Sequence, residues 1–137
     1  MIIKNELPPI YEDIIASGLN PTAYAIYTYG DIIYNPSGVE IPRDIIAHEE
    51  VHEKQQQDIG GPDIWWSRFL DDQYFRMDQE AEAYAVQYDF MCKIRKDRNL
   101  RNRILLHYAQ TLASPTYGSV LSTTSAMKLI KSKVKTK

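Results

Sequence analysis

Two histidines four residues apart, His48 and His52, constrain this chain more than any other feature. They enclose Glu49 in the pattern His-Glu-x-x-His, within a segment from Pro42 to about Gln57 that predicts a helix. Residues four apart lie on the same side of a helix, so both imidazoles point the same way. Two nitrogens one turn apart fit two corners of a zinc tetrahedron, and Glu49 between them can reach a metal-bound water. The segment therefore predicts the zinc-binding helix of a hydrolase.

The residues around this motif predict a small sheet followed by helices. Three short segments rich in β-branched and aromatic residues, separated by turn residues, predict strands: Ala23–Tyr29, Ile32–Tyr34 and Val39–Ile41. Helical spacing and helix-start residues predict further helices: Ile10–Ser17, Asp63–Leu70, Gln73–Lys96, Asp97–Thr111 and Ser122–Lys135. This order indicates an α+β fold with the sheet at one end and a helical bundle that carries the motif. The 137 residues suit one domain, with residues 1–22 as a lead-in and residues 128–137 as a basic tail.

Composition argues against several classes of protein. A net charge of −2 does not favour nucleic-acid binding, and the lysine-rich residues 128–137 are interpreted as the solvated end of a helix. No apolar stretch is long enough for a signal peptide or a membrane span, so we expect a cytoplasmic location and no membrane partner. Cys92 is the only cysteine, which excludes an internal disulfide and a cysteine-rich metal site. Nothing in the composition indicates an oligomeric state.

Several residues are candidates for the third zinc ligand that a catalytic site needs. Glu80 and Glu82 lie on the longest predicted helix, where they are about 200° apart, so only one of them can face the metal. Helical periodicity does not choose between these two glutamates. The motif that resembles the start of the metzincin pattern would continue with glycine at 55 and a last ligand at 58, where this chain has Gln55 and Asp58. Without the glycine, the helix has no obvious way to turn sharply and bring Asp58 back.

The motif and the later Glu80-x-x-Ala83 together resemble the gluzincin metallopeptidases, particularly their minimal single-domain members. The resemblance implies a zincin-like fold in which Glu80 is the third ligand. The aspartate that closes the gluzincin motif, and that commonly supports a ligating histidine, is replaced here by Tyr84. Three nearby polar residues are candidates for that support: Gln56, Asp72 and Asp78.

The resemblance covers about residues 23–135, although its specific content lies in residues 48–84. Residues 112–118 and the helix predicted after them look like the C-terminal part of small zinc-peptidase-like proteins that phages often encode. The activity implied is Zn²⁺-dependent cleavage of a peptide or protein substrate, with Glu49 as the general base. The alternative is a catalytically inactive, gluzincin-like binding or structural protein, such as a phage component.

A peptidase of this kind also needs a hydrogen-bond donor for the oxyanion and a place for its substrate. Four residues are candidates for the donor: His107, Tyr108, Tyr117 and Tyr74. We favour His107 as a catalytic residue because it is the only remaining histidine. Gluzincins lay an extended peptide against an edge strand above the zinc, and each of the three predicted strands is a candidate for that edge.

Overall fold

The computed structural model describes residues 1–135, so Lys137 of the predicted basic tail lies outside the described residues. The fold is α+β, with a small sheet and mostly helices, as the sequence predicts. Its strands are β1 (Ile2–Lys4), β2 (Tyr27–Tyr29) and β3 (Ile32–Tyr34). Its helices are α1 (Tyr11–Ala16), α2 (Arg43–Ile59), α3 (Pro62–Asp71), α4 (Gln73–Ile94), α5 (Arg98–Leu112) and α6 (Thr123–Lys133), with a 3₁₀ turn η1 (Pro115–Tyr117). Within the described chain, no helix is both long and apolar enough to cross a membrane.

The sheet has the order β1-β3-β2, so β3 lies in its centre. Strands β2 and β3 form the predicted antiparallel hairpin, whose turn contains Gly30 at a φ of 63°, a left-handed conformation that glycine adopts without strain. Strand β1 was not predicted, and it pairs in parallel with β3, placing Ile3 opposite Ile33. The prediction of a strand at 39–41 is wrong. There the carbonyl of Val39 accepts a hydrogen bond from the Asn35 side chain at 2.7 Å, within a turn.

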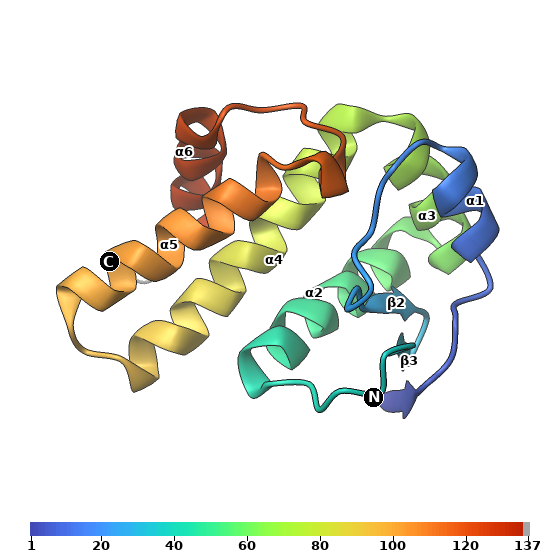
Figure 1. Ribbon diagram of the computed structural model, residues 1–137, viewed down its shortest axis with the longest axis horizontal. Helices are drawn as coiled ribbons and strands as arrows, with labels where there is room; N and C mark the ends of the chain where they lie inside the picture. The colour runs from blue at the N-terminus through green and yellow to red at the C-terminus, as the bar shows by residue number, and fades with distance from the viewer. Residues whose placement is uncertain (136–137) are drawn as a thin grey trace.

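Two clusters of buried apolar side chains lie on either side of the molecule. The N-terminal core joins α1, the hairpin and α3: Ile10, Ile14, Tyr27, Tyr34, Trp65, Trp66 and Phe69. The C-terminal core joins α4, α5 and α6: Met77, Ala81, Tyr84, Ala85, Leu105, Tyr108, Ala109, Leu112, Ala126 and Ile130. Figure 1 shows the sheet and α1 on one side and α5 and α6 on the other, with α2 and α4 between them. Helices α2 and α4 also pack against each other, so they join the two cores.

The ends of α2 and α4 are set by local sequence. Helix α2 stops at Gly60, whose φ of 111° reverses the chain, and the amide of Gly61 donates to the carbonyl of Gln56 at 2.7 Å. Pro62 then begins α3, where a missing amide hydrogen costs nothing. Helix α4 begins at the cap residue Asp72, whose carboxylate accepts from two backbone amides at 3.0 Å each. Because these residues fix where α2 stops and where α4 begins, they set which residues of α4 lie opposite α2.

Candidate metal centre

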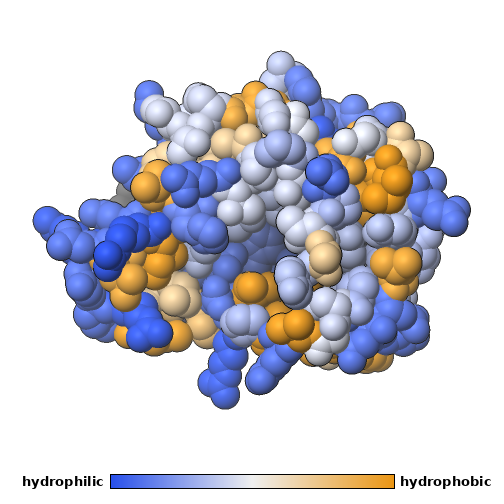
Figure 2. Space-filling model, viewed as in Figure 1, coloured by the Kyte–Doolittle hydropathy of each residue, from blue (hydrophilic) through white to orange (hydrophobic). Residues whose placement is uncertain are grey.

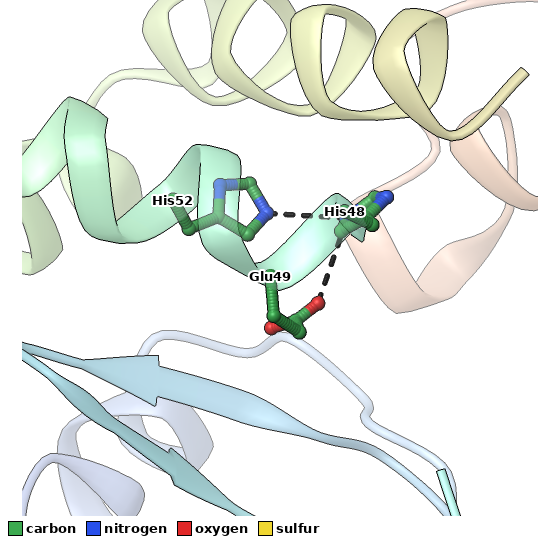
Figure 3. A group of neighbouring side chains, drawn as sticks. All are labelled: His48, Glu49 and His52. Carbon is green, nitrogen blue, oxygen red and sulfur yellow. Dashed lines mark hydrogen bonds and ion pairs between the residues drawn. The ribbon is translucent and has the colours of Figure 1, made fainter. Parts of the chain in front are cut away.

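The motif residues His48, Glu49 and His52 lie on α2, and all three are buried. Each offers a ligand atom within 4.8 Å of those of the other two, which is close enough for the group to hold a metal ion. Figure 3 shows the two imidazoles side by side and Glu49 turned to the sheet side of the helix. The inward orientation predicted from helical spacing is thus present.

Helix α4 brings Glu80, and not Glu82, to the two histidines. The Oε1 atom of Glu80 lies 3.2 Å from Nε2 of His48 and 2.5 Å from Nε2 of His52. The two Nε2 atoms are themselves 3.2 Å apart. Ligand atoms at zinc-binding distance on a tetrahedron are separated by about 3.3 Å. The two separations of 3.2 Å match this value, whereas the contact between Glu80 and His52 has the length of a direct hydrogen bond. Glu82 is turned toward Gln55 and accepts a hydrogen bond from its amide at 3.1 Å.

The other nitrogen of each imidazole is held by a glutamine. Nδ1 of His48 lies 2.9 Å from Oε1 of Gln87, and Nδ1 of His52 lies 2.8 Å from Oε1 of Gln55. An amide oxygen only accepts, so each Nδ1 carries a hydrogen, and in the neutral imidazoles the lone pair of each Nε2 faces Glu80. Two lone pairs and a carboxylate oxygen therefore converge in a buried space, and a shared cation, either a proton or a metal ion, offsets their repulsion. This donor set fits zinc.

His52 and Glu80, the two groups in closest contact, shift each other's pKa. Burial lowers the pKa of His52, but the charge of Glu80 and the hydrogen bond to it prevail and raise the pKa to about 9. Burial raises the pKa of Glu80, yet the attraction of His52 and His48 holds that pKa well below its ordinary range. Glu80 is therefore an anion at neutral pH, the form that binds a metal ion.

The residues proposed from sequence to support a histidine have other partners. Asp72 caps α4, and Asp78 forms an ion pair with Lys133 at 2.6 Å. Gln56 is buried between helix and sheet, where it accepts from the amide of Gly30 at 2.8 Å and donates to the carbonyl of Thr28 at 2.8 Å. Their predicted role is therefore wrong, because each side chain is already engaged away from the imidazoles.

The glutamines that take this role were missed in the sequence, although a signal was present. Gln55 follows His52 by three residues, and Gln87 follows Glu80 by seven, so each shares a helix face with a predicted ligand. Asp58, a rejected candidate for the third ligand, is exposed on the opposite side and pairs with Lys54 at 3.5 Å.

Glu49 is placed to exchange protons. Its Oε1 accepts a hydrogen bond from the hydroxyl of Thr28 at 3.0 Å, and its Oε2 lies 3.7 Å from Nε2 of His48. Burial raises the pKa of Glu49, and the nearby histidines and the Thr28 hydroxyl partly oppose that rise. A buried carboxylate with a raised pKa is a stronger base than an exposed one, which suits a general base.

A cavity of about 340 Å³ opens above these residues, between the N-terminal segment and α5. Figure 2 shows the surface hollowed near the middle of this face. One wall is largely apolar and comes from residues 14–27 and α3, whereas the opposite wall carries the polar groups of α5 and η1. The cavity gives the candidate ligands a path to solvent.

Three of the four candidate oxyanion donors line this cavity: His107, Tyr108 and Tyr117. Tyr74 does not, since it lies at the start of α4 with 74% of its surface exposed. The hydroxyl of Tyr117 lies 3.2 Å from that of Tyr84, while the ring of Tyr108 stacks on that of Tyr84. His107 is exposed on α5 beside Tyr108, with ring centroids 6.4 Å apart.

The predicted use of an edge strand is restricted by the sheet order. Strand β3 is central and pairs on both sides, and the segment 39–41 is not a strand. Strand β2 is an edge and contacts α2, but the carbonyl of Thr28 already accepts from Trp66 at 2.9 Å and from Gln56. Of the segments proposed to bind an extended peptide, only the residues preceding β2, from 23 to 26, remain candidates.

Comparison of the chain with protein-family models, with curated proteins and with solved structures gave no match.

Proposed function

We propose that this protein is a zinc-dependent peptidase with a zincin-like arrangement of its metal-binding helices. The observation that carries the proposal is the convergence of Nε2 of His48, Nε2 of His52 and Oε1 of Glu80 within 3.2 Å of one another. Two imidazoles and one carboxylate are a donor set of catalytic zinc sites, which keep a fourth position open. The adjoining cavity supports access to that position.

Zinc held by these three residues would supply a Lewis acid that acidifies water and polarises a peptide carbonyl. Glu49 accepts the proton of the attacking water and later returns it to the nitrogen of the leaving amine. The hydroxyl of Thr28 holds the Glu49 carboxylate in place during both transfers. His107, Tyr108 and Tyr117 on the polar wall are the residues available to donate to the developing oxyanion.

The test replaces Glu49 by glutamine, which keeps the shape of the side chain but removes its basicity. The Glu49→Gln variant is expected to bind one zinc per chain and to lose at least 10²-fold in peptide cleavage. Zinc is measured by elemental analysis, and cleavage is measured with a library of fluorogenic peptides. The matched control is Glu50→Gln on the exposed next position of the same helix, which should cleave like the wild type.

Undiminished cleavage by Glu49→Gln would rule out this mechanism. A wild-type protein that binds zinc and cleaves no peptide in the library would instead support the inactive, binding or structural alternative. A protein that binds no zinc would refute both.

A further inference from the structure

The first of two similar hydrogen-bonded chains begins at His48 and crosses from α2 to α4 and back. Nδ1 of His48 faces Oε1 of Gln87 on α4, and Nε2 of Gln87 donates to Oδ2 of Asp44 at 2.8 Å, in the first turn of α2. Because Asp44 accepts only, it fixes which end of the amide is its nitrogen. The amide oxygen of Gln87 must then face His48.

The second chain begins at His52 and reaches α4 at a different level. Nδ1 of His52 faces Oε1 of Gln55 on α2, and Nε2 of Gln55 donates to Glu82 at 3.1 Å and to the carbonyl of Gln79 at 3.0 Å. Both acceptors again fix the orientation of the amide. Glu82, a candidate ligand in the sequence, is therefore the outer end of this chain.

Each imidazole is thus joined to a carboxylate through a neutral amide. Ligating histidines in metal sites usually donate their second hydrogen to a carboxylate, a carbonyl or water, and this partner fixes the tautomer. We propose that Gln55 and Gln87 are positioning residues of the zinc site, and that Asp44 and Glu82 act on the metal only through them. This inference rests on the proposed zinc site, and it does not depend on peptide cleavage.

The amide spacer has an electrostatic consequence. A carboxylate directly against Nδ1 would make the imidazole a stronger donor and would neutralise part of the charge of the ion. A glutamine fixes the same tautomer without adding charge beside the site. Among the residues that the structure describes, the buried carboxylates lining this space are Glu80 and Glu49, which would face the two charges of Zn²⁺.

The experiment measures the zinc affinity of the purified chain by competition with a chromophoric chelator. Gln87→Leu, which cannot accept a hydrogen bond, is expected to weaken zinc binding by about 10- to 100-fold. The paired exchange of Gln87→Glu with Asp44→Asn keeps an acceptor toward His48 and a donor–acceptor contact between positions 87 and 44, and should bind zinc at least as tightly as the wild type. Gln57→Leu, an exposed glutamine on α2, is the matched control and should change nothing.

Asp44 provides the sharper test because the proposal places it away from the metal. Asp44→Ala frees the Gln87 amide to turn over and should weaken zinc binding by a smaller factor, about 3- to 10-fold. In the double variant with Gln87→Leu the two losses should not add, because both act on one imidazole. The visible spectrum of the Co²⁺-substituted protein should shift in Gln87→Leu and stay as in the wild type in Gln57→Leu.

Wild-type affinity in a folded Gln87→Leu variant, or strictly additive losses with Asp44→Ala, would overturn the proposal. A wild type that binds no zinc would overturn it together with the proposed function. If the wild type binds zinc but cleaves no peptide, the zinc affinities of the variants still test the role of the glutamines. Failure of the proposed peptidase activity can therefore be told apart from failure of this inference.

Discussion

The hydrogen bond between Thr28 on β2 and Glu49 on α2 connects the sheet directly to the proposed general base. Thr28 is 1% exposed, and its hydroxyl lies 3.0 Å from Oε1 and 3.2 Å from the backbone carbonyl of Glu49. The hydroxyl has one hydrogen, so it can donate to only one of these oxygens at a time. Its bond to the carboxylate stabilises the anion and opposes the rise in pKa that burial causes.

Replacing Thr28 by valine removes this hydroxyl at nearly constant volume. The pKa of Glu49 should then rise further, so the acid limb of the pH profile of kcat/KM should move to higher pH. A lost hydrogen bond to a charged group of about 1.5 kcal/mol corresponds to a movement of that limb by about one pH unit. Steady-state kinetics across pH checks this result, with Thr28→Ser as the control. An unshifted acid limb would contradict the role given to Thr28.

The three motif residues could be predicted from sequence because a helix fixes the relation between neighbours three and four apart. The choice between Glu80 and Glu82 could not, since it depends on how α4 is rotated against α2. Both glutamates lie on helical stripes with apolar residues, and only packing turns Glu80 inward. Gln87 and Asp44 are 43 positions apart, and that contact too exists only in the folded chain.

Helix α4 is the element on which the whole site depends, because it presents Glu80, Glu82 and Gln87 to α2. Its N-terminal cap is Asp72, which accepts from the amides of Tyr74 and Phe75. The cap satisfies two of the amides that a helix start leaves without partners. Asp72 is also the single residue that connects α3 to α4.

Substituting Asp72 by alanine should lower the free energy of unfolding by about 1 kcal/mol, the usual cost of a lost N-cap. For a domain of this size the thermal midpoint should fall by about 4 °C. Asp72→Asn, which retains an acceptor, should lose much less. Urea denaturation followed by circular dichroism measures both variants in zinc-free buffer. Equal stability of Asp72→Ala and the wild type would show that the cap contributes nothing.

The predicted end of each helix lies within two residues of the observed end, because glycine, proline and capping residues stand near most of these positions. The strands were less predictable. Strand β1 is exposed along its length and pairs in parallel with residues about 30 positions away. Three residues are too few to show a period of two, and the pairing that makes them a strand exists only in the folded chain. The residues at 39–41 have strand composition, but they pair with no strand, and the carbonyl of Val39 accepts from the side chain of Asn35.

For the whole molecule, the candidate metal centre lies where the two cores meet. The histidines come from α2 and Glu80 from α4, while the Trp65 ring of the N-terminal core lies 5.1 Å from the ring of His52. On the opposite side, the Tyr84 ring of the C-terminal core lies 4.6 Å from that of His48. An ion held here would therefore join the two halves of the fold and stabilise the native state as a whole.

Removing zinc should accordingly lower the stability of the entire protein in one transition. At free zinc 100 times its dissociation constant, binding stabilises the folded state by about 2.7 kcal/mol. The thermal midpoint should then fall by on the order of 10 °C when a chelator is added. Calorimetry with and without chelator measures this difference. The His52→Ala variant should show no such difference, and an equal response in that variant would place the stabilising ion elsewhere.

The charged residues of the cavity wall indicate which part of a polypeptide the proposed peptidase would cleave. Among the described residues that line it, none is lysine or arginine, and its two carboxylates face the histidines. Neither the α-carboxylate nor the α-ammonium group at the end of a chain would find an uncommitted opposite charge. For the proposed peptidase, the arrangement favours internal cleavage of a strand that passes through the hollow over removal of residues from an end.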